Sequence, residues 1–220
     1  YFNPLLKKNG QDVRVPGYCT DVFTDAAIGF IEQNAAAPFF CYLATNAPHD
    51  PLQIEDRYWK PFAAQGLDEK TARVYGMIKN LDENIGRILS TLDRLGIAED
   101  TIVMYSTDNG PHYNSWPDAA ITPFRSEKNS NWEGAYRVPA FLRWPAKWQS
   151  GVTLNGIVAH QDMLTTFLAA AGEPDVAAKC RAGHDAAGKT FKVILDGKDM
   201  NAYFARSEER RVGKECRSRW

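Results

Sequence analysis

Hydrophobic residues recur every three or four positions in three segments of the chain, and this spacing predicts three amphipathic helices. The three segments are 20–31, 70–95 and 161–171. Residues that favour helix ends flank them. The candidate N-caps are Thr20, Asp21 and Asp68, and the candidate C-terminal glycines are Gly96 and Gly172.

A short continuous apolar run, 39–44, predicts a strand that is buried on both faces, and the apolar, β-branched run 101–107 predicts another strand. Shorter runs predict further strands at 140–144, 154–158 and 190–195. Turn dipeptides crowd residues 1–19 and predict a loop or a short hairpin there. Because strands and helices alternate, we expect an α/β fold with a largely parallel sheet flanked by helices.

Residues 111–137 lack any such periodicity. A long irregular stretch within a compact domain is usually functional or disordered. Four aromatic residues favour an ordered stretch here: Trp116, Phe124, Trp132 and Tyr136.

Composition narrows the possible classes of protein. The chain has 220 residues, of which 44% are hydrophobic and 24% charged, as in one ordinary globular domain. These values exclude a disordered tail and a collagen-like repeat. No run reaches about 18 apolar residues, so we expect no membrane-spanning segment. The net charge of -1 predicts no nucleic-acid partner.

The last fifteen residues, 206–220, differ from the rest of the chain. They show no apolar periodicity, and they resemble one reading frame of a common DNA-sequencing adapter. We therefore interpret 206–220 as unstructured read-through and exclude it from the fold. The alternative is a genuine basic tail that binds nucleic acid. Without these residues the chain holds 20 basic and 24 acidic residues, a net charge of -4.

The cysteines do not indicate a compartment. Cys19, Cys41 and Cys180 are widely spaced and form neither a CxxC metal site nor an evident disulfide framework. Tyr1 is not a methionine, so a missing signal peptide carries no information.

Residues that could take part in catalysis or metal binding follow two of the predicted strands. His49 comes after the first strand, and Asp108 and Asn109 directly follow the second. Ligands bind beyond the carboxyl ends of strands in open α/β sheets, which favours a functional reading. Alone, Asp-Asn-Gly is more often a turn, and a histidine between prolines is more often a loop residue. Lys128 lies 20 residues beyond Asp108 and is either a solvated loop charge or a cation facing an anionic substrate.

Four stretches in order and register resemble the sulfatase family of the alkaline-phosphatase-like superfamily. They are YLATNAPHDP at 42–51, YSTDNG at 105–110, TPFRSEK at 122–128 with WEGAYRVP at 132–139, and HQDMLTTFLAAAG at 160–172. The resemblance covers nearly all of residues 1–205, and it implies an alkaline-phosphatase-like fold and cleavage of sulfate monoesters.

The resemblance also implies roles for four residues. Asp108 and Asn109 would be oxygen ligands of a divalent cation, usually calcium, which suits a carboxylate and an amide carbonyl. Lys128 would contact a sulfate oxygen and the bridging oxygen. His49 would donate a proton to the leaving group. These groups would stabilise negative charge where it develops as the ester breaks.

The family's nucleophile motif has no counterpart in this chain. Sulfatases carry a Cys- or Ser-x-Pro-x-Arg motif whose first residue becomes formylglycine, and neither the cysteines nor the serines here fit it. An early pair of acidic metal ligands is also missing. We therefore expect residues 1–205 to be part of a sulfatase catalytic domain that relies on an upstream formylglycine. The chain alone is expected to be inactive.

Two other functions stay open. One is a phosphatase or phosphodiesterase of the same superfamily, and the other is a catalytically dead pseudo-enzyme that binds anions. The substrate is a small-molecule or saccharide sulfate ester that the sequence does not identify further; Tyr113 and Trp116 are candidate aromatic contacts. The resemblance implies a periplasmic or secreted protein, and the oligomeric state stays open.

Overall fold

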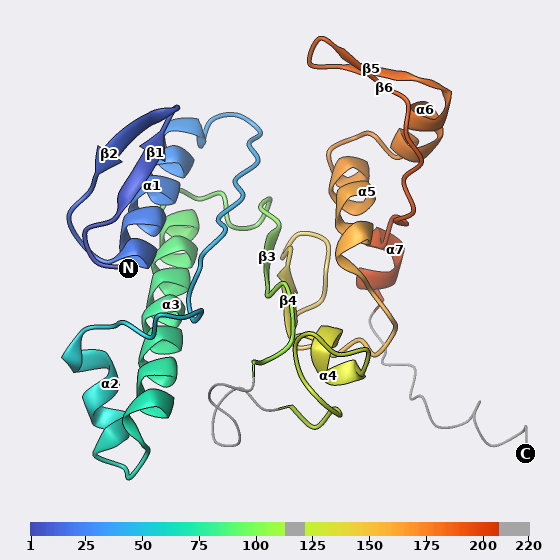
Figure 1. The fold of residues 1–220 in the computed structure, drawn as a ribbon. Helices are drawn as coiled ribbons and strands as arrows, with labels where there is room; N and C mark the ends of the chain where they lie inside the picture. Colours follow the sequence, from blue (N-terminus) through green and yellow to red (C-terminus); the bar gives the residue numbers. More distant parts are fainter. Residues whose placement is uncertain (113–121, 207–220) are drawn as a thin grey trace, which may run out of the picture. The chain divides into compact units, whose positions relative to one another are not determined.

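The computed structural model describes residues 1–112 and 122–206 (Figure 1). Our predictions for Tyr113, Trp116 and the tail from residue 207 onward lie outside these residues. The chain divides into two compact units, 1–142 and 143–220, and each unit is described by itself.

Unit 1 opens with an antiparallel hairpin of β1 (Leu5–Lys8) and β2 (Gln11–Arg14), in which Lys8 pairs with Gln11. The two turn residues between them, Asn9 and Gly10, both have positive φ angles, of 51° and 84°. A two-residue turn of this kind matches the twist of the strands it joins, and Asn-Gly adopts it readily. The prediction of a loop or short hairpin is confirmed as a hairpin.

Helix α1 (Cys19–Asn34) follows the hairpin and packs on α3 (Glu69–Arg94) (Figure 1). The predicted N-caps of α1 are wrong, because Tyr18 occupies that position without a side-chain cap. Tertiary contacts replace the cap: the Cys19 N–H donates to the Tyr1 carbonyl at 2.9 Å. Thr20 lies inside the helix and is completely buried.

The predicted ends of α3 are confirmed. The Asp68 carboxylate accepts from the backbone N–H groups of Lys70 and Thr71, at 2.9 and 3.2 Å. Gly96 follows the helix with a φ of +70°. The buried face of α3 includes Met77, Leu81 and Leu92, as the spacing predicts.

A helix that the sequence analysis did not predict, α2 (Asp56–Ala63), packs on α3. Its sequence DRYWKPFA contains a proline and three charged residues, so its apolar pattern is short. The packing is close, because a Cβ placed on Gly76 would lie 3.0 Å from the Trp59 Cβ.

Two predicted strands are confirmed: β3 (Val103–Ser106) and β4 (Ala140–Arg143), which pair with each other. Two others are wrong, since neither 39–44 nor 154–158 forms a strand. Phe40 and Tyr42 are 74% and 83% exposed, and Ile157 is 97% exposed. A strand buried on both faces needs strands beside it, and run 39–44 has none among the described residues.

The expected largely parallel sheet is therefore not found among the described residues. Each sheet has two strands, and the hairpins β1–β2 and β5–β6 are antiparallel. The α/β character itself is present, because helices α1 and α3 precede the paired strands β3 and β4.

The irregular stretch that the sequence predicts at 111–137 is ordered where the structure describes it. It contains one short helix, α4 (Glu133–Tyr136), in which Gly134 and Ala135 are buried. No helix among the described residues is long and apolar enough to cross a membrane.

Unit 2 is built around α5 (His160–Ala170), which confirms the third predicted helix. Two short helices, α6 (Val176–Ala182) and α7 (Asn201–Phe204), and the hairpin of β5 (His184–Ala186) and β6 (Lys189–Phe191) complete it. The predicted strand at 190–195 thus ends at Phe191. The Asp162 carboxylate and the Thr166 hydroxyl accept the N–H groups of Lys198 and Met200, which fixes the approach to α7.

Candidate functional site

The Asp108–Asn109 pair lies in the turn after β3, as the sequence predicts. Asp108 is exposed and Asn109 is half-buried. The Asn109 amide donates from Nδ2 to the Gly110 carbonyl at 2.8 Å. Because Nδ2 is engaged in this way, the amide oxygen Oδ1 is the Asn109 side-chain atom that a cation would bind.

Lys128 is attached to this same turn through its backbone. The Lys128 N–H donates to the Pro111 carbonyl at 2.8 Å, and Pro111 is two residues beyond Asn109. A second bond joins Gly110 N–H to the Ala135 carbonyl at 2.7 Å. The segments around Lys128 and Ala135, 20 and 27 residues beyond Asp108, are thereby held against the turn.

The contact depends on two glycines. A Cβ on Gly110 would lie 1.8 Å from the Gly134 carbonyl oxygen, and a Cβ on Gly134 would lie 1.9 Å from the Ser126 carbonyl oxygen. Side-chain carbon atoms do not approach backbone oxygens so closely. Glycine at both positions therefore lets the segment that carries Lys128 reach the turn.

The cations around Lys128 have partners of their own. The Arg125 guanidinium lies over the Trp132 ring at 3.8 Å, and that of Arg137 lies over Phe124 at 4.1 Å. Arg137 also forms an ion pair with Glu133 at 3.1 Å. Within 1–112 and 122–206, no carboxylate pairs with the half-buried Lys128 ammonium. Lys128 differs from both arginines in that the described residues show neither an aromatic ring nor a carboxylate against its ammonium.

His49 lies in an exposed loop that local hydrogen bonds shape. Its backbone N–H donates to the Asn46 carbonyl at 2.9 Å, and its ring Nδ1 lies 3.0 Å from the Asp50 carbonyl oxygen. The Tyr1 hydroxyl reaches the same loop, 2.8 Å from the Asn46 carbonyl oxygen and 2.6 Å from that of His49. Tyr1 is partly buried, and burial, followed by the nearby Cys19 and Asp50, raises its pKa to about 12.

The donor set near β3 fits part of a divalent-cation site. Asp108 supplies a carboxylate and Asn109 an amide oxygen, which are the ligands a hard cation prefers. Calcium takes six to eight oxygen ligands, so these two would provide a minority of the shell. The described part of the chain contains no group of three or more His, Cys, Asp or Glu side chains arranged to hold a metal ion.

The structure thus connects three of the four predicted site residues. Backbone bonds join the segment of Lys128 to the turn of Asp108 and Asn109. No hydrogen bond or ion pair among the described residues joins His49 to any of them. Tyr1 was missed because it stands in no motif, and Gly134 was missed although it lies in the 132–139 stretch, because only the folded chain shows their contacts.

Comparison with known proteins agrees with the motifs. A family model described as Sulfatase matches residues 2–173. The chain is 33% identical over 150 residues to an arylsulfatase of Hemicentrotus pulcherrimus, and the match covers 67% of this chain and 25% of that protein. It is 30% identical over 174 residues to the N-acetylgalactosamine-6-sulfatase of Mus musculus, covering 77% of this chain and 31% of that protein. The chain therefore spans about a third or less of the length of these relatives.

Solved structures of sulfatases share its fold. The structure of Ps i-CgsB in complex with k-i-k-neocarrahexaose matches with a TM-score of 0.77 and 29% identity, over 94% of this chain and 42% of that one. The PsFucS1 sulfatase from Pseudoalteromonas sp. matches with a TM-score of 0.69 and 24% identity, over 91% of this chain and 38% of that one. Since the family model covers well over half of its residues, this chain belongs to the sulfatase family.

Proposed function

We propose that the whole protein hydrolyses sulfate monoesters and that this chain supplies part of the active site. The backbone bond from Lys128 N–H to the Pro111 carbonyl is the observation that supports this most directly. It holds the backbone of a lysine against the turn that carries a carboxylate and an amide oxygen. Residues of these types suit an anionic ester together with a cation.

Each side chain has a distinct task in this proposal. Asp108 and Asn109 hold a divalent cation, with calcium the proposed ion, through their side-chain oxygens. When bound, the cation draws electron density from the sulfate oxygens. The Lys128 ammonium binds a sulfate oxygen and the bridging oxygen, so it stabilises the charge that grows there as the bond breaks. His49, in its protonated form, delivers a proton to the departing oxygen.

The nucleophile is proposed to come from outside residues 1–220. No Cys or Ser in the sequence begins a Cys- or Ser-x-Pro-x-Arg motif. In the whole protein, His49 would protonate the leaving oxygen, and a formylglycine made from such a motif would supply the nucleophile. The 220-residue chain by itself is accordingly proposed to be inactive, since loss of a covalent nucleophile costs many orders of magnitude in rate.

The proposed substrate is a sulfate ester on a saccharide. The solved relative Ps i-CgsB holds an oligosaccharide, k-i-k-neocarrahexaose, and the relative in Mus musculus is an N-acetylgalactosamine-6-sulfatase. Each of these names contains a saccharide: a neocarrahexaose in the first and N-acetylgalactosamine in the second. An extracytoplasmic location, periplasmic or secreted, is proposed on the family resemblance.

The test starts with the sequence of the parent gene, recovered with adapter-free long reads. The proposal expects a Cys- or Ser-x-Pro-x-Arg motif encoded upstream of Tyr1. The purified parent should cleave 4-nitrophenyl sulfate far faster than 4-nitrophenyl phosphate, and it should lose activity on chelation. A faster reaction with the phosphate would indicate a phosphatase of the same superfamily, and no reaction with either would indicate an anion-binding pseudo-enzyme.

A further inference from the structure

We propose that Tyr1 is a positioning residue for His49. Its hydroxyl holds the 46–50 loop so that His49 keeps a proton on Nδ1 and presents Nε2 as the nitrogen that exchanges a proton. The catalytic consequence of this arrangement rests on the role proposed above for His49. The arrangement itself is a property of the chain and is testable without catalysis.

The Tyr1 hydroxyl contacts the backbone of the 46–50 loop. The Tyr1 oxygen lies 2.8 Å from the Asn46 carbonyl oxygen and 2.6 Å from the His49 carbonyl oxygen. A carbonyl oxygen only accepts, so the hydroxyl is the donor and shares its one proton between the two. One side chain therefore holds both ends of the turn that the His49 N–H closes onto the Asn46 carbonyl.

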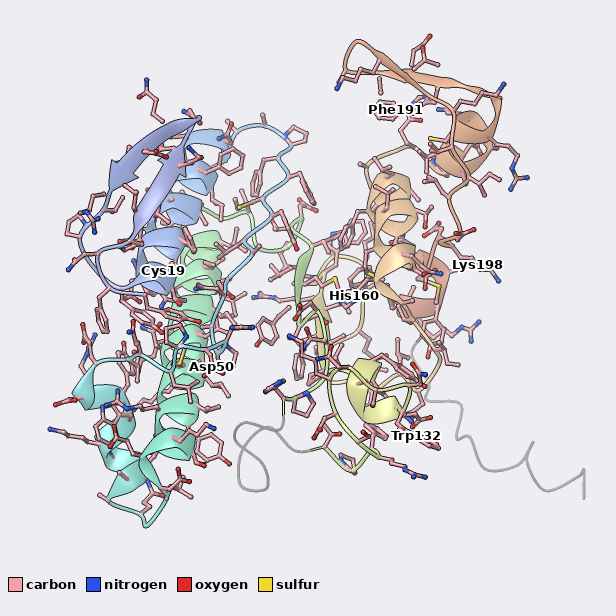
Figure 2. The ribbon with its side chains drawn as sticks, viewed as in Figure 1. Cys19, Asp50, Trp132, His160, Phe191 and Lys198 are labelled. Atoms are coloured by element: carbon pink, nitrogen blue, oxygen red, sulfur yellow. The ribbon has the colours of Figure 1, made fainter. Side chains whose placement is uncertain are left out.

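Tyr1 is itself fixed to the core of unit 1. Its carbonyl accepts the Cys19 N–H at 2.9 Å, and its ring stacks on Tyr18 with centroids 5.5 Å apart and planes at 15°. Tyr18 is 2% exposed and belongs to the cluster of buried residues around Met77. Figure 2 labels Cys19 and Asp50, which mark the two segments that Tyr1 joins. The hydroxyl is thus anchored to α1 and cannot follow the loop if the loop moves.

The loop packs on the same core from its own side. Ala47 and Leu52, before and after His49, contact the cluster that contains Tyr18 and Met77. Apolar contacts set the distance between the loop and the core of unit 1, but they do not set the direction in which the loop carbonyl groups point. The directional bonds from Tyr1 set that orientation.

Orientation of the loop decides the tautomer of His49. The ring Nδ1 lies 3.0 Å from the Asp50 carbonyl oxygen, which has no proton to give. Nδ1 must therefore carry the proton, and in the neutral ring the lone pair is on Nε2. When Nε2 gains a proton it becomes the donor that a departing oxygen requires.

Burial keeps the Tyr1 hydroxyl protonated. Desolvation raises the pKa of Tyr1 to about 12, and the nearby Cys19 and Asp50 act in the same direction. An ordinary tyrosine, with a pKa of about 10, is already a donor throughout the neutral range, as the contact with two carbonyl oxygens requires, and burial extends that range.

The test compares two tyrosines that stack on each other. Tyr1→Phe removes the hydroxyl that contacts the loop. Tyr18→Phe is the matched control, because the Tyr18 hydroxyl has no hydrogen-bond partner in the described ranges. Nitrogen-15 NMR of the 220-residue chain reports the His49 tautomer at a pH where the ring is neutral, and a His49→Asn variant assigns the signals.

The wild-type chain and Tyr18→Phe should both show the Nδ1–H tautomer. Tyr1→Phe should shift the His49 signals toward the Nε2–H tautomer, with the amide signals of α1 and α3 unchanged. A His49 ring unaffected by Tyr1→Phe overturns the proposal. If Tyr1→Phe does not fold, nuclear Overhauser contacts in the wild type between the Tyr1 ring and the backbone of Asn46 and His49 decide: their presence supports the contact, and their absence overturns it.

Kinetic measurements on the whole protein then distinguish a failure of the proposed Tyr1 role from a failure of the proposed sulfate-ester hydrolysis. In the whole protein, Tyr1→Phe should lower kcat more than it changes KM, and the loss should grow for poorer leaving groups. A shifted tautomer with unchanged sulfate hydrolysis supports the positioning by Tyr1 and removes His49 from the proposed mechanism. An unshifted tautomer overturns the positioning, whatever the activity.

Discussion

Gly134 is a residue whose replacement should disturb the segment that carries Lys128. A methyl group there would lie 1.9 Å from the Ser126 carbonyl oxygen, so the backbone must move. We expect Gly134→Ala to destabilise unit 1 and to lengthen the bond between Lys128 N–H and the Pro111 carbonyl. Urea denaturation and the exchange rate of the Lys128 amide measure the two effects.

The control for this variant is Gly86→Ala on α3. A Cβ at Gly86 meets no atom within 4 Å, and alanine favours the helix by up to about 1 kcal/mol. This variant should therefore be slightly more stable than the wild type. Equal stability of Gly134→Ala and Gly86→Ala would contradict the close approach.

Asp68 supplies a pH-dependent contribution to stability. Hydrogen bonds from the Thr71 side chain and backbone, followed by those from other backbone N–H groups, lower the pKa of the Asp68 carboxyl. A carboxyl whose pKa is lower in the folded state stabilises it at pH above the unfolded value, about 3.9, and loses this effect as the pH falls through the folded value. Asp68→Asn should thus reduce the melting temperature at pH 7 and leave it nearly unchanged near pH 2. A difference that is the same at both pH values would contradict this assignment.

At the scale of elements, the packing of α1 on α3 includes a polar contact. One Asp21 carboxylate oxygen accepts from the Asn80 amide at 2.8 Å and from the Asn84 amide at 2.7 Å. Asn80 and Asn84 are both buried. The Asn84 amide also donates to the Asn80 carbonyl at 2.9 Å.

Asp21→Ala should therefore destabilise the protein by about 1–3 kcal/mol, the typical penalty of a buried polar group without a partner. Asp25→Ala is the matched control on the same helix. It removes only an exposed ion pair with Arg87, and such a pair contributes about 1 kcal/mol or less. Denaturant midpoints compare the two variants, and an equal loss would show that the buried amides do not need Asp21.

Elements with a strong local signal were predictable from the sequence. The regular apolar spacing of α3, the Asp68 cap and the Asn9-Gly10 turn act over a few residues, so each could be predicted locally. The strand predicted at 39–44 failed because an apolar run becomes a strand only beside others. The start of α1 was missed by two residues, since it depends on a bond to Tyr1.

The candidate site was predictable only where its residues stand in local sequence motifs. His49, Asp108, Asn109 and Lys128 were proposed from motifs, and the structure connects the last three. Their mutual contact depends on Gly110 and Gly134, whose roles appear only when distant segments meet. The contact of Tyr1 with the His49 loop spans more than 40 residues and has no local signature.

On the scale of the whole molecule, the exposed run 39–44 predicts self-association of the 220-residue chain. Phe40 and Tyr42 are largely exposed, and large exposed apolar side chains that lie close together favour association. Sedimentation velocity should show oligomers that increase with concentration. Phe40→Ser with Tyr42→Ser should shift the chain toward monomer, whereas Lys8→Ser on the hairpin should not; a wild-type chain that stays monomeric would contradict this expectation.

The central claim is that Lys128 acts on the sulfate group beside Asp108 and Asn109. Steady-state hydrolysis of 4-nitrophenyl sulfate by the whole protein tests it, with Lys128→Ala compared with Lys79→Ala on the exposed face of α3. We predict that Lys128→Ala lowers kcat by about 10²–10³-fold, as for other groups that stabilise developing negative charge, while Lys79→Ala leaves kcat unchanged. Equal kcat values for both variants and the wild type would contradict the account.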